Sequence, residues 1–130
     1  MRIGILAALV TLSSSALAGE EAAVLKGNEL RNAISGKTVY LMTSVGAEIP
    51  IRYMRNGTIH GTVSASLAAL GGESVYSDTG RWWVMRDHLC QQWENWSDNR
   101  SHCYEFRTAG SSVQWRRNDG QTGTARIASN

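Results

Sequence analysis

The chain has 130 residues, 42% of them hydrophobic and 18% charged, and a formal net charge of +2. This length suits one small domain, and the hydrophobic fraction is that of a folded protein. The charges are scattered and alternate in sign, which excludes the basic stripe of a nucleic-acid-binding protein and the polybasic run of a membrane-surface protein.

The N-terminus has the pattern of a secretory signal peptide. Arg2 supplies a positive charge, residues 3–12 form an apolar run, and Ala16-Leu17-Ala18 matches the small-x-small cleavage site. The run is too short for a membrane-spanning helix, which needs about 20 apolar residues. We therefore expect cleavage after Ala18 and a periplasmic or secreted mature chain. No later segment predicts a membrane span.

A lead-in and a short helix are expected next. Residues 19–27 predict a flexible lead-in, and residues 28–35 predict the helix. Asn28 can cap the helix, apolar side chains four residues apart share one face, and Gly36 suits the C-terminal end.

About eight segments after this helix have the alternating pattern of short strands. Their ranges are 38–42, 49–54, 58–63, 81–85, 89–93, 103–107, 113–116 and 122–127. Asn56-Gly57 predicts a two-residue hairpin turn, because both residues tolerate positive φ. Asp78-Thr79-Gly80 predicts another turn, and residues 64–73 fit either a helical turn or a loop. Strands at this spacing predict an antiparallel meander that closes into a barrel, with a β-sandwich as the alternative.

The two cysteines, Cys90 and Cys103, fall on neighbouring predicted strands. In an oxidising compartment, cysteines placed in this way are expected to form a disulfide. A zinc site that adds His88 and His102 is the competing interpretation. Adjacent strand residues point to opposite faces, however, which separates His102 from Cys103. We therefore expect a disulfide, no metal and no cofactor.

Five tryptophans, two of them adjacent at 82 and 83, give the next signal. Most of them are expected to fill the core, and one of the adjacent pair should face outward. A ligand pocket at the barrel mouth would be lined by some of Tyr40, Tyr53, Trp82, Trp93 and Trp115. A surface patch for a partner protein would instead use Gln92, Trp93, Trp96 and Arg100.

Catalytic motifs are absent from the sequence. It has no hydrolase serine elbow, no phosphate-binding loop and no carboxylate pair whose spacing requires acid–base work. A cysteine nucleophile would need a free thiol, which the predicted disulfide removes. A single carboxylate such as Asp87 or Glu94 is weak support for an enzyme. We expect a protein without enzymatic activity.

Five segments in a fixed order carry a resemblance to a known family. They are the end of the short helix with the residues after it, Ile34-Ser35-Gly36-Lys37-Thr38-Val39, then Ile51 through Gly61, Thr79-Gly80-Arg81-Trp82-Trp83-Val84, Leu89-Cys90-Gln91-Gln92-Trp93 and Cys103-Tyr104. Together they resemble the small exported proteobacterial proteins of a domain family of unknown function with a lipocalin-like barrel. The resemblance covers about residues 25–127 and implies a periplasmic destination and no catalytic residue. The chain is also loosely similar to periplasmic barrel inhibitors of lysozyme and of proteases, without their inhibitory motifs.

The sequence thus predicts an all-β, lipocalin-like barrel over residues 28–130, with one short N-terminal helix and one disulfide. The function expected first is binding of a small apolar or amphipathic ligand. The alternative is a protein-binding or inhibitor module that acts on another exported protein through the Trp93–Arg100 loop. A hollow interior would favour the ligand, and an exposed tryptophan in the loop would favour the partner protein.

Overall fold

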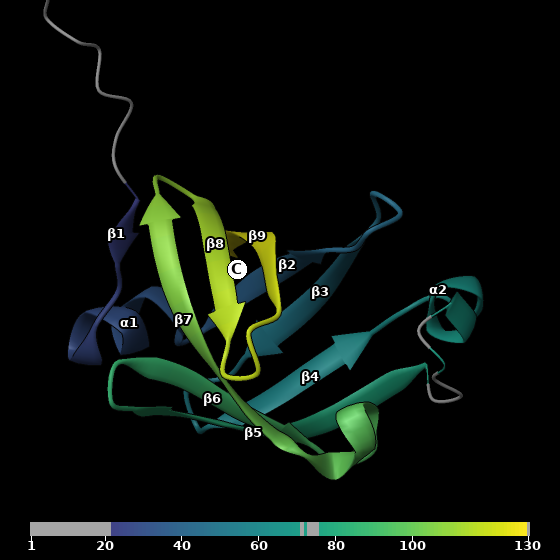
Figure 1. Cartoon of the computed structure of the whole chain (residues 1–130). Coiled ribbons are helices and arrows are strands. Elements are labelled where there is room, and N and C mark those ends of the chain that lie inside the picture. The colour runs from purple at the N-terminus through teal and green to yellow at the C-terminus, as the bar shows by residue number, and fades with distance from the viewer. Residues whose placement is uncertain (1–21, 71, 73–75, 130) are drawn as a thin grey trace, which may run out of the picture.

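The computed structural model describes residues 22–70, 72 and 76–129, and its centre is a closed antiparallel β-barrel (Figure 1). Eight strands follow one another around the barrel in chain order, and pairing between β7 and β8 and between β2 and β9 completes the circle. The strands are β2 (Lys37–Met42), β3 (Glu48–Tyr53), β4 (Thr58–Thr62), β5 (Ser77–Met85), β6 (His88–Trp93), β7 (Ser101–Ala109), β8 (Ser112–Arg117) and β9 (Thr122–Ser129). The predicted meander and its closure into a barrel are confirmed.

A further short strand lies at the N-terminal side. The predicted signal segment, residues 1–18, and residues 19–21 of the predicted lead-in lie outside the described residues. Within the lead-in, β1 (Ala23–Val24) pairs with Arg107 and Thr108 of β7. Strand β6 pairs with β7 only from Ser101 to Tyr104. Strand β1 therefore covers the part of β7 that β6 does not reach.

Helix α1 (Gly27–Ile34) closes one end of the barrel, which we call the base. Its Leu30 and Ile34 side chains lie on one face and are fully buried. The prediction that Asn28 caps this helix is wrong. The helix begins one residue earlier, and the N–H of Gly27 donates to Oδ1 of Asp87 at 2.9 Å, from the turn between β5 and β6.

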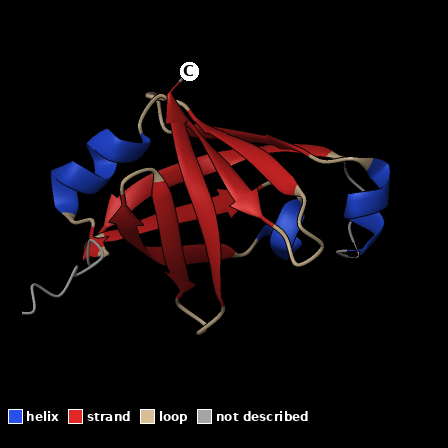
Figure 2. Cartoon of the chain, turned by 90° about the horizontal axis from the view of Figure 1, so that it is seen from above, coloured by secondary structure: helices blue, strands red, loops and turns tan. Residues whose placement is uncertain are grey.

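A second helix, α2 (Ala65–Leu70), follows β4, so this part of the segment 64–73, which the sequence left open between helical turn and loop, is helical. Residues 71 and 73 of that segment lie outside the described residues. Figure 2 shows α1 and α2 at opposite ends of the molecule. We call the end of the barrel away from α1 the mouth. None of the helices in the described part of the chain has the length and apolar character needed to cross a bilayer.

The β3–β4 hairpin turns where predicted but with a different geometry. Only Gly57 adopts a positive φ, of 89°, and Asn56 does not. The N–H of Gly57 donates to the carbonyl of Met54, and the N–H of Met54 donates to the carbonyl of Thr58. The loop is therefore longer than the predicted two-residue turn.

The predicted turn at Asp78-Thr79-Gly80 is wrong, because these residues lie inside β5. Each pairs with a residue of β4. A Cβ atom at Gly80 would overlap the backbone of Gln92 on the neighbouring strand. This glycine therefore allows two strands to approach closely, which produces the same sequence signal as a turn.

The disulfide between Cys90 and Cys103 joins β6 and β7, whose residues lie directly opposite one another. The predicted pairing is confirmed, and it occupies both thiols of the proposed zinc site. Across residues 22–129 as described, no group of three metal-binding side chains lies close enough to hold an ion. A loop of this length contributes about 3 kcal/mol to stability in the chain-entropy account.

Candidate functional site

Alternate residues of each strand point into the barrel and make its interior apolar. Val39 pairs with Ile51 and Leu41 pairs with Ile49 across the β2–β3 ladder, and all four side chains face inward. The end next to α1 is tightly filled, since Ile59, Leu89 and Val113 are almost completely buried. The other half of the interior is not filled.

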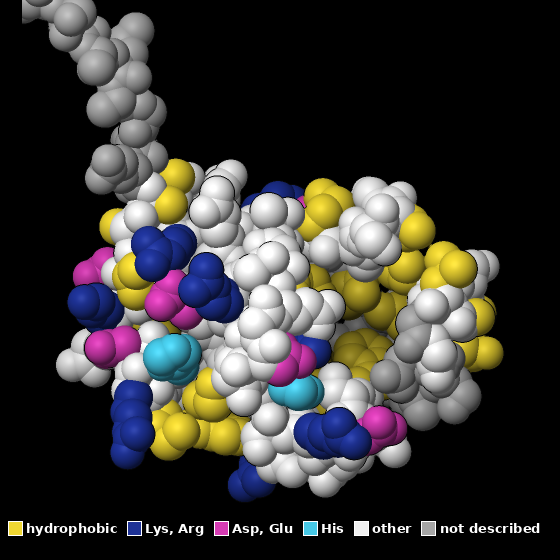
Figure 3. Space-filling view, viewed as in Figure 1, with side chains coloured by type: hydrophobic (Ala, Val, Ile, Leu, Met, Phe, Trp, Pro, Cys, Tyr) yellow, Lys and Arg dark blue, Asp and Glu magenta, His cyan; other side chains and the backbone are white. Residues whose placement is uncertain are grey.

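A cavity of about 610 Å³ occupies the half of the barrel near the mouth. Its walls are mostly aliphatic and aromatic, with Leu41, Ile51, Val63, Trp93 and Phe106 among them. Figure 3 shows the hollow, with hydrophobic side chains on its floor, between the β8–β9 hairpin and α2. Sites for small organic ligands have volumes of about 300–1,000 Å³ and walls of this kind.

Glycines explain how so many tryptophans fit while the interior stays hollow. A Cβ atom at Gly61 would lie 2.6 Å from the ring of Trp96, and one at Gly123 would overlap the ring of Trp115. The large rings therefore lie against bare backbone instead of filling the centre. Substituting either glycine would push a ring into the cavity or strain the strand.

A line of polar side chains runs along one wall of the cavity. The hydroxyl of Tyr53 donates to Oε1 of Gln91 at 2.6 Å, and the Gln91 side chain is buried. Tyr104 and Arg117 lie opposite one another on β7 and β8, and both side chains line the cavity. Burial raises the pKa of Tyr53 and of Tyr104, so both remain neutral hydroxyls at physiological pH.

The ring of Trp115 packs edge-on against Tyr104, with the ring centroids 5.4 Å apart. Its indole N–H is buried and has no acceptor among the described residues. Trp115 thus adds an aromatic surface to the wall beside the polar line.

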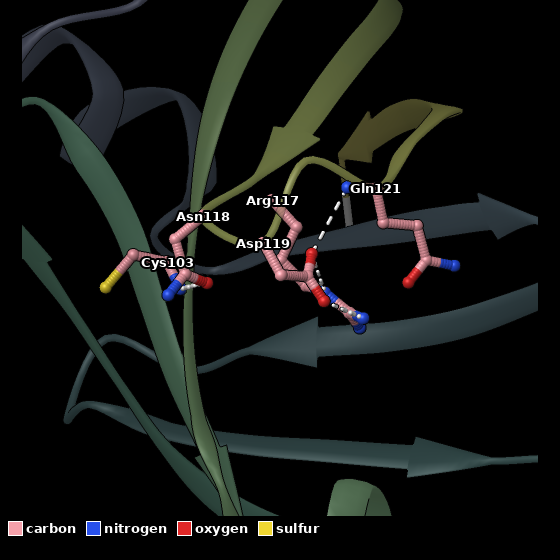
Figure 4. Close-up of polar contacts among 5 residues, drawn as sticks. All are labelled: Cys103, Arg117, Asn118, Asp119 and Gln121. Atoms are coloured by element: carbon pink, nitrogen blue, oxygen red, sulfur yellow. Dashed lines mark hydrogen bonds and ion pairs between the residues drawn. The ribbon is translucent and has the colours of Figure 1, made fainter.

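Arg117 stands at the mouth end of this line. Its Nε donates to Oδ1 of Asp119 at 2.9 Å and its Nη2 donates to Oδ2 at 2.6 Å. Figure 4 shows Asp119 between Arg117 and the backbone N–H of Gln121, which also donates to the carboxylate. These donors hold the pKa of Asp119 far below its usual value, so the pair is ionised throughout the physiological range.

The loop between β6 and β7 borders the mouth and contains the short helix η1 (Trp96–Asn99). Trp96 packs on Trp93 with ring centroids 4.7 Å apart, and only 9% and 4% of these two residues are exposed. Asp78 holds the loop from β5, since its carboxylate accepts the backbone N–H groups of Asn95 and Trp96. The loop therefore does not present an exposed tryptophan.

The structure brings together three of the five side chains predicted for a pocket, Tyr53, Trp93 and Trp115, in the cavity wall. Tyr40 is on the outer face, beneath the guanidinium of Arg126 at 3.9 Å from the ring centroid. Trp82 is buried outside the cavity lining, where it packs against Tyr53 with centroids 5.8 Å apart.

The residues predicted for a partner surface are divided. Trp93 and Trp96 face the cavity, whereas Gln92 and Arg100 lie at the outer surface. Gln92 binds Arg81 and Asn99 there, through its side-chain oxygen and nitrogen.

Three polar residues of the cavity were missed from the sequence. Gln91, Tyr104 and Arg117 lie at inward positions, each two residues along its strand from an aromatic side chain that also lines the cavity, namely Trp93, Phe106 and Trp115. The alternation Val113-x-Trp115-x-Arg117 contains the signal, because residues two apart share a strand face.

A comparison of the chain with known protein families, with curated proteins and with solved structures gives no match. The protein is therefore classified by its fold alone, as an eight-stranded antiparallel β-barrel. The hollow half of its interior is the candidate functional site.

Proposed function

We propose that this protein is a non-enzymatic binding protein that holds a small apolar or amphipathic ligand inside its barrel. The observation that carries the proposal is the cavity of about 610 Å³ at the mouth. Mostly apolar walls with a few placed polar groups are typical of small-molecule sites. A solid interior would have left no room for a ligand.

We further propose that the protein is exported and belongs to the family of exported barrel proteins that its sequence resembles. The N-terminal pattern of a signal peptide supports export. The Cys90–Cys103 disulfide is consistent with an oxidising compartment, and the barrel is the fold that the resemblance implies. The alternative, a protein-binding loop at Trp93–Arg100, has weaker support because its two tryptophans are buried.

The cavity can be tested with the neutral fluorescent probe N-phenyl-1-naphthylamine. We expect saturable binding, seen as enhanced probe emission and quenched tryptophan emission. Val63 lines the cavity, so Val63→Trp should fill part of it and weaken binding at least ~10-fold. The neighbouring Thr62 is exposed, so Thr62→Trp is the matched control and should bind like the wild type.

Two results would contradict the proposal. One is a wild-type protein that does not bind the probe, and the other is equal binding by both variants. Thermal unfolding of each variant shows whether it is folded. A native mass spectrum of protein purified from the periplasm adds an independent measurement, because extra mass that disappears on denaturation reveals a ligand carried from the cell.

A further inference from the structure

We propose that the ligand is an amphipathic carboxylic acid whose carboxylate binds Arg117 and Tyr104 at the mouth while its apolar body lies in the cavity. This inference rests on the proposed function and specifies its ligand. It comes from the distribution of charge and of unused hydrogen-bond donors along the cavity wall.

The charged side chain in the cavity wall is basic. Arg117 is the only basic side chain that lines the cavity in the described part of the chain, and no acidic side chain lines it there. Asp119 pairs with Arg117 from outside the lining, and 46% of its side chain is exposed to water. A ligand in the cavity therefore meets a cation and no anion, which favours a negatively charged head group.

The guanidinium of Arg117 also has N–H donors that Asp119 does not use. A guanidinium carries five N–H donors in a fixed fork. Asp119 accepts two of them. Three donors remain, and only 21% of the Arg117 side chain is exposed. A charge-assisted hydrogen bond in so sheltered a place is stronger than one at an open surface.

Tyr104 supplies a second kind of donor. Its phenol lines the cavity together with Gln91, whose Oε1 already accepts from Tyr53. The O–H of Tyr104 can therefore donate to a ligand in the cavity. A carboxylate offers two acceptor oxygens and no donor, so it suits a phenol O–H beside guanidinium N–H groups.

The position of these groups fixes the orientation of the ligand. Arg117 is the last residue of β8, at the mouth, and the apolar wall continues from it toward the base. An alkyl or aromatic body can then bury its surface in the cavity while the head stays near water. Burying the head instead would require desolvation of the charge with no cation at the base to offset it.

The test compares three twelve-carbon ligands that differ only in the head group: dodecanoate, dodecanol and dodecylamine. Dodecanoate and dodecylamine are added below their micelle concentrations and dodecanol below its solubility limit, all at pH 8, and displacement of N-phenyl-1-naphthylamine is measured. We expect dodecanoate to bind ~10-fold tighter than dodecanol, and dodecylamine to bind most weakly.

Arg117→Met should reduce the dodecanoate-to-dodecanol ratio to about one. The matched control is Arg126→Met, because Arg126 is also paired with a carboxylate, Glu48, but on the outer face. This control should keep the wild-type ratio. Tyr104→Phe removes only the hydroxyl and should lower the dodecanoate-to-dodecanol ratio less than Arg117→Met does. This second variant keeps the proposal testable if Arg117→Met does not fold.

The outcomes separate the two proposals. Binding of the neutral probe and of dodecanol without a preference for dodecanoate would overturn the carboxylate site and leave the binding function standing. The same conclusion follows if Arg117→Met and Tyr104→Phe both retain the preference. If neither the probe nor any twelve-carbon ligand binds, both proposals fail.

Discussion

Asp78 offers a sharp test of how the mouth of the barrel is built. Only 5% of this residue is exposed, yet its carboxylate accepts four hydrogen bonds. Oδ2 accepts the backbone N–H groups of Asn95 at 2.8 Å and Trp96 at 2.7 Å. Oδ1 accepts the N–H of Thr79 at 3.0 Å and Nδ2 of Asn95 at 3.1 Å. The Asp78 side chain therefore attaches the loop that contains η1 to strand β5.

Asp78→Asn keeps the shape of the side chain but replaces one oxygen with an NH₂ group. The remaining oxygen can accept either the two donors now on Oδ2 or the two now on Oδ1. The other two donors then face the new NH₂ group, which cannot accept a hydrogen bond. Hydrogen bonds to a charged acceptor contribute about 1.5–3 kcal/mol each, and the displaced donors of Thr79 and Asn95 are only partly buried. We expect the free energy of unfolding to fall by about 3 kcal/mol, which corresponds to a Tm lower by about 12–24 °C.

The measurement is thermal and urea unfolding followed by circular dichroism. Asp98→Asn is the control, because Asp98 belongs to the same loop but is exposed, and it should change stability by less than about 0.5 kcal/mol. If the two variants unfold at the same temperature, the Asp78 carboxylate does not hold the loop. That result would refute the reasoning.

The pH dependence gives a second readout of the same group. Burial alone would raise the pKa of Asp78, but the N–H groups of Trp96 and Asn95 outweigh it and the pKa is lowered. The stabilisation is therefore present above the ordinary value of 3.8 and is lost as the pH falls through the lower folded-state value. The wild type should lose stability below about pH 4, and Asp78→Asn should lose less there.

Three further predictions concern the core, the polar line and the disulfide. Gly61→Ala should cost about 1–3 kcal/mol in urea unfolding because its Cβ would lie 2.6 Å from the Trp96 ring, and an unchanged midpoint would contradict this packing. Burial raises the pKa of Tyr53, so the folded state should lose stability above pH 10; Tyr53→Phe should lose less, and identical pH profiles would count against the buried hydroxyl. Replacing Cys90 and Cys103 together with alanine should lower the free energy of unfolding by about 3 kcal/mol, and a much smaller loss would mean that the loop is fixed without the bond.

The strands could be predicted because period-two alternation and turn residues are local signals. The errors came from residues with two uses. Gly80 allows strands β5 and β6 to approach closely. The carboxylate of Asp78 accepts a backbone N–H group of the loop between β6 and β7. Both residue types are also typical of turns, and only the tertiary partner distinguishes the two uses.

The cavity was harder to predict than the barrel. Tyr40 and Tyr53 look alike in the sequence, but Tyr40 lies between the inward residues Val39 and Leu41 and so faces outward. A shift of one residue in register reverses the face of every side chain on a strand. Arg117 has no apolar signal in the sequence, because its inward orientation depends on pairing with Tyr104 across β7 and β8.

The closed base has a kinetic consequence. Among the described residues that end is filled by fully buried side chains, including Leu30 and Ile34 of α1, so a ligand of the kind we propose would have to leave through the opening by which it arrived. Microscopic reversibility then requires that an obstruction at that opening slow arrival and departure by the same factor. A bulkier residue at Ser44 or Gln121, which line the cavity near the turns at the mouth, should slow both the entry and the release of such a ligand.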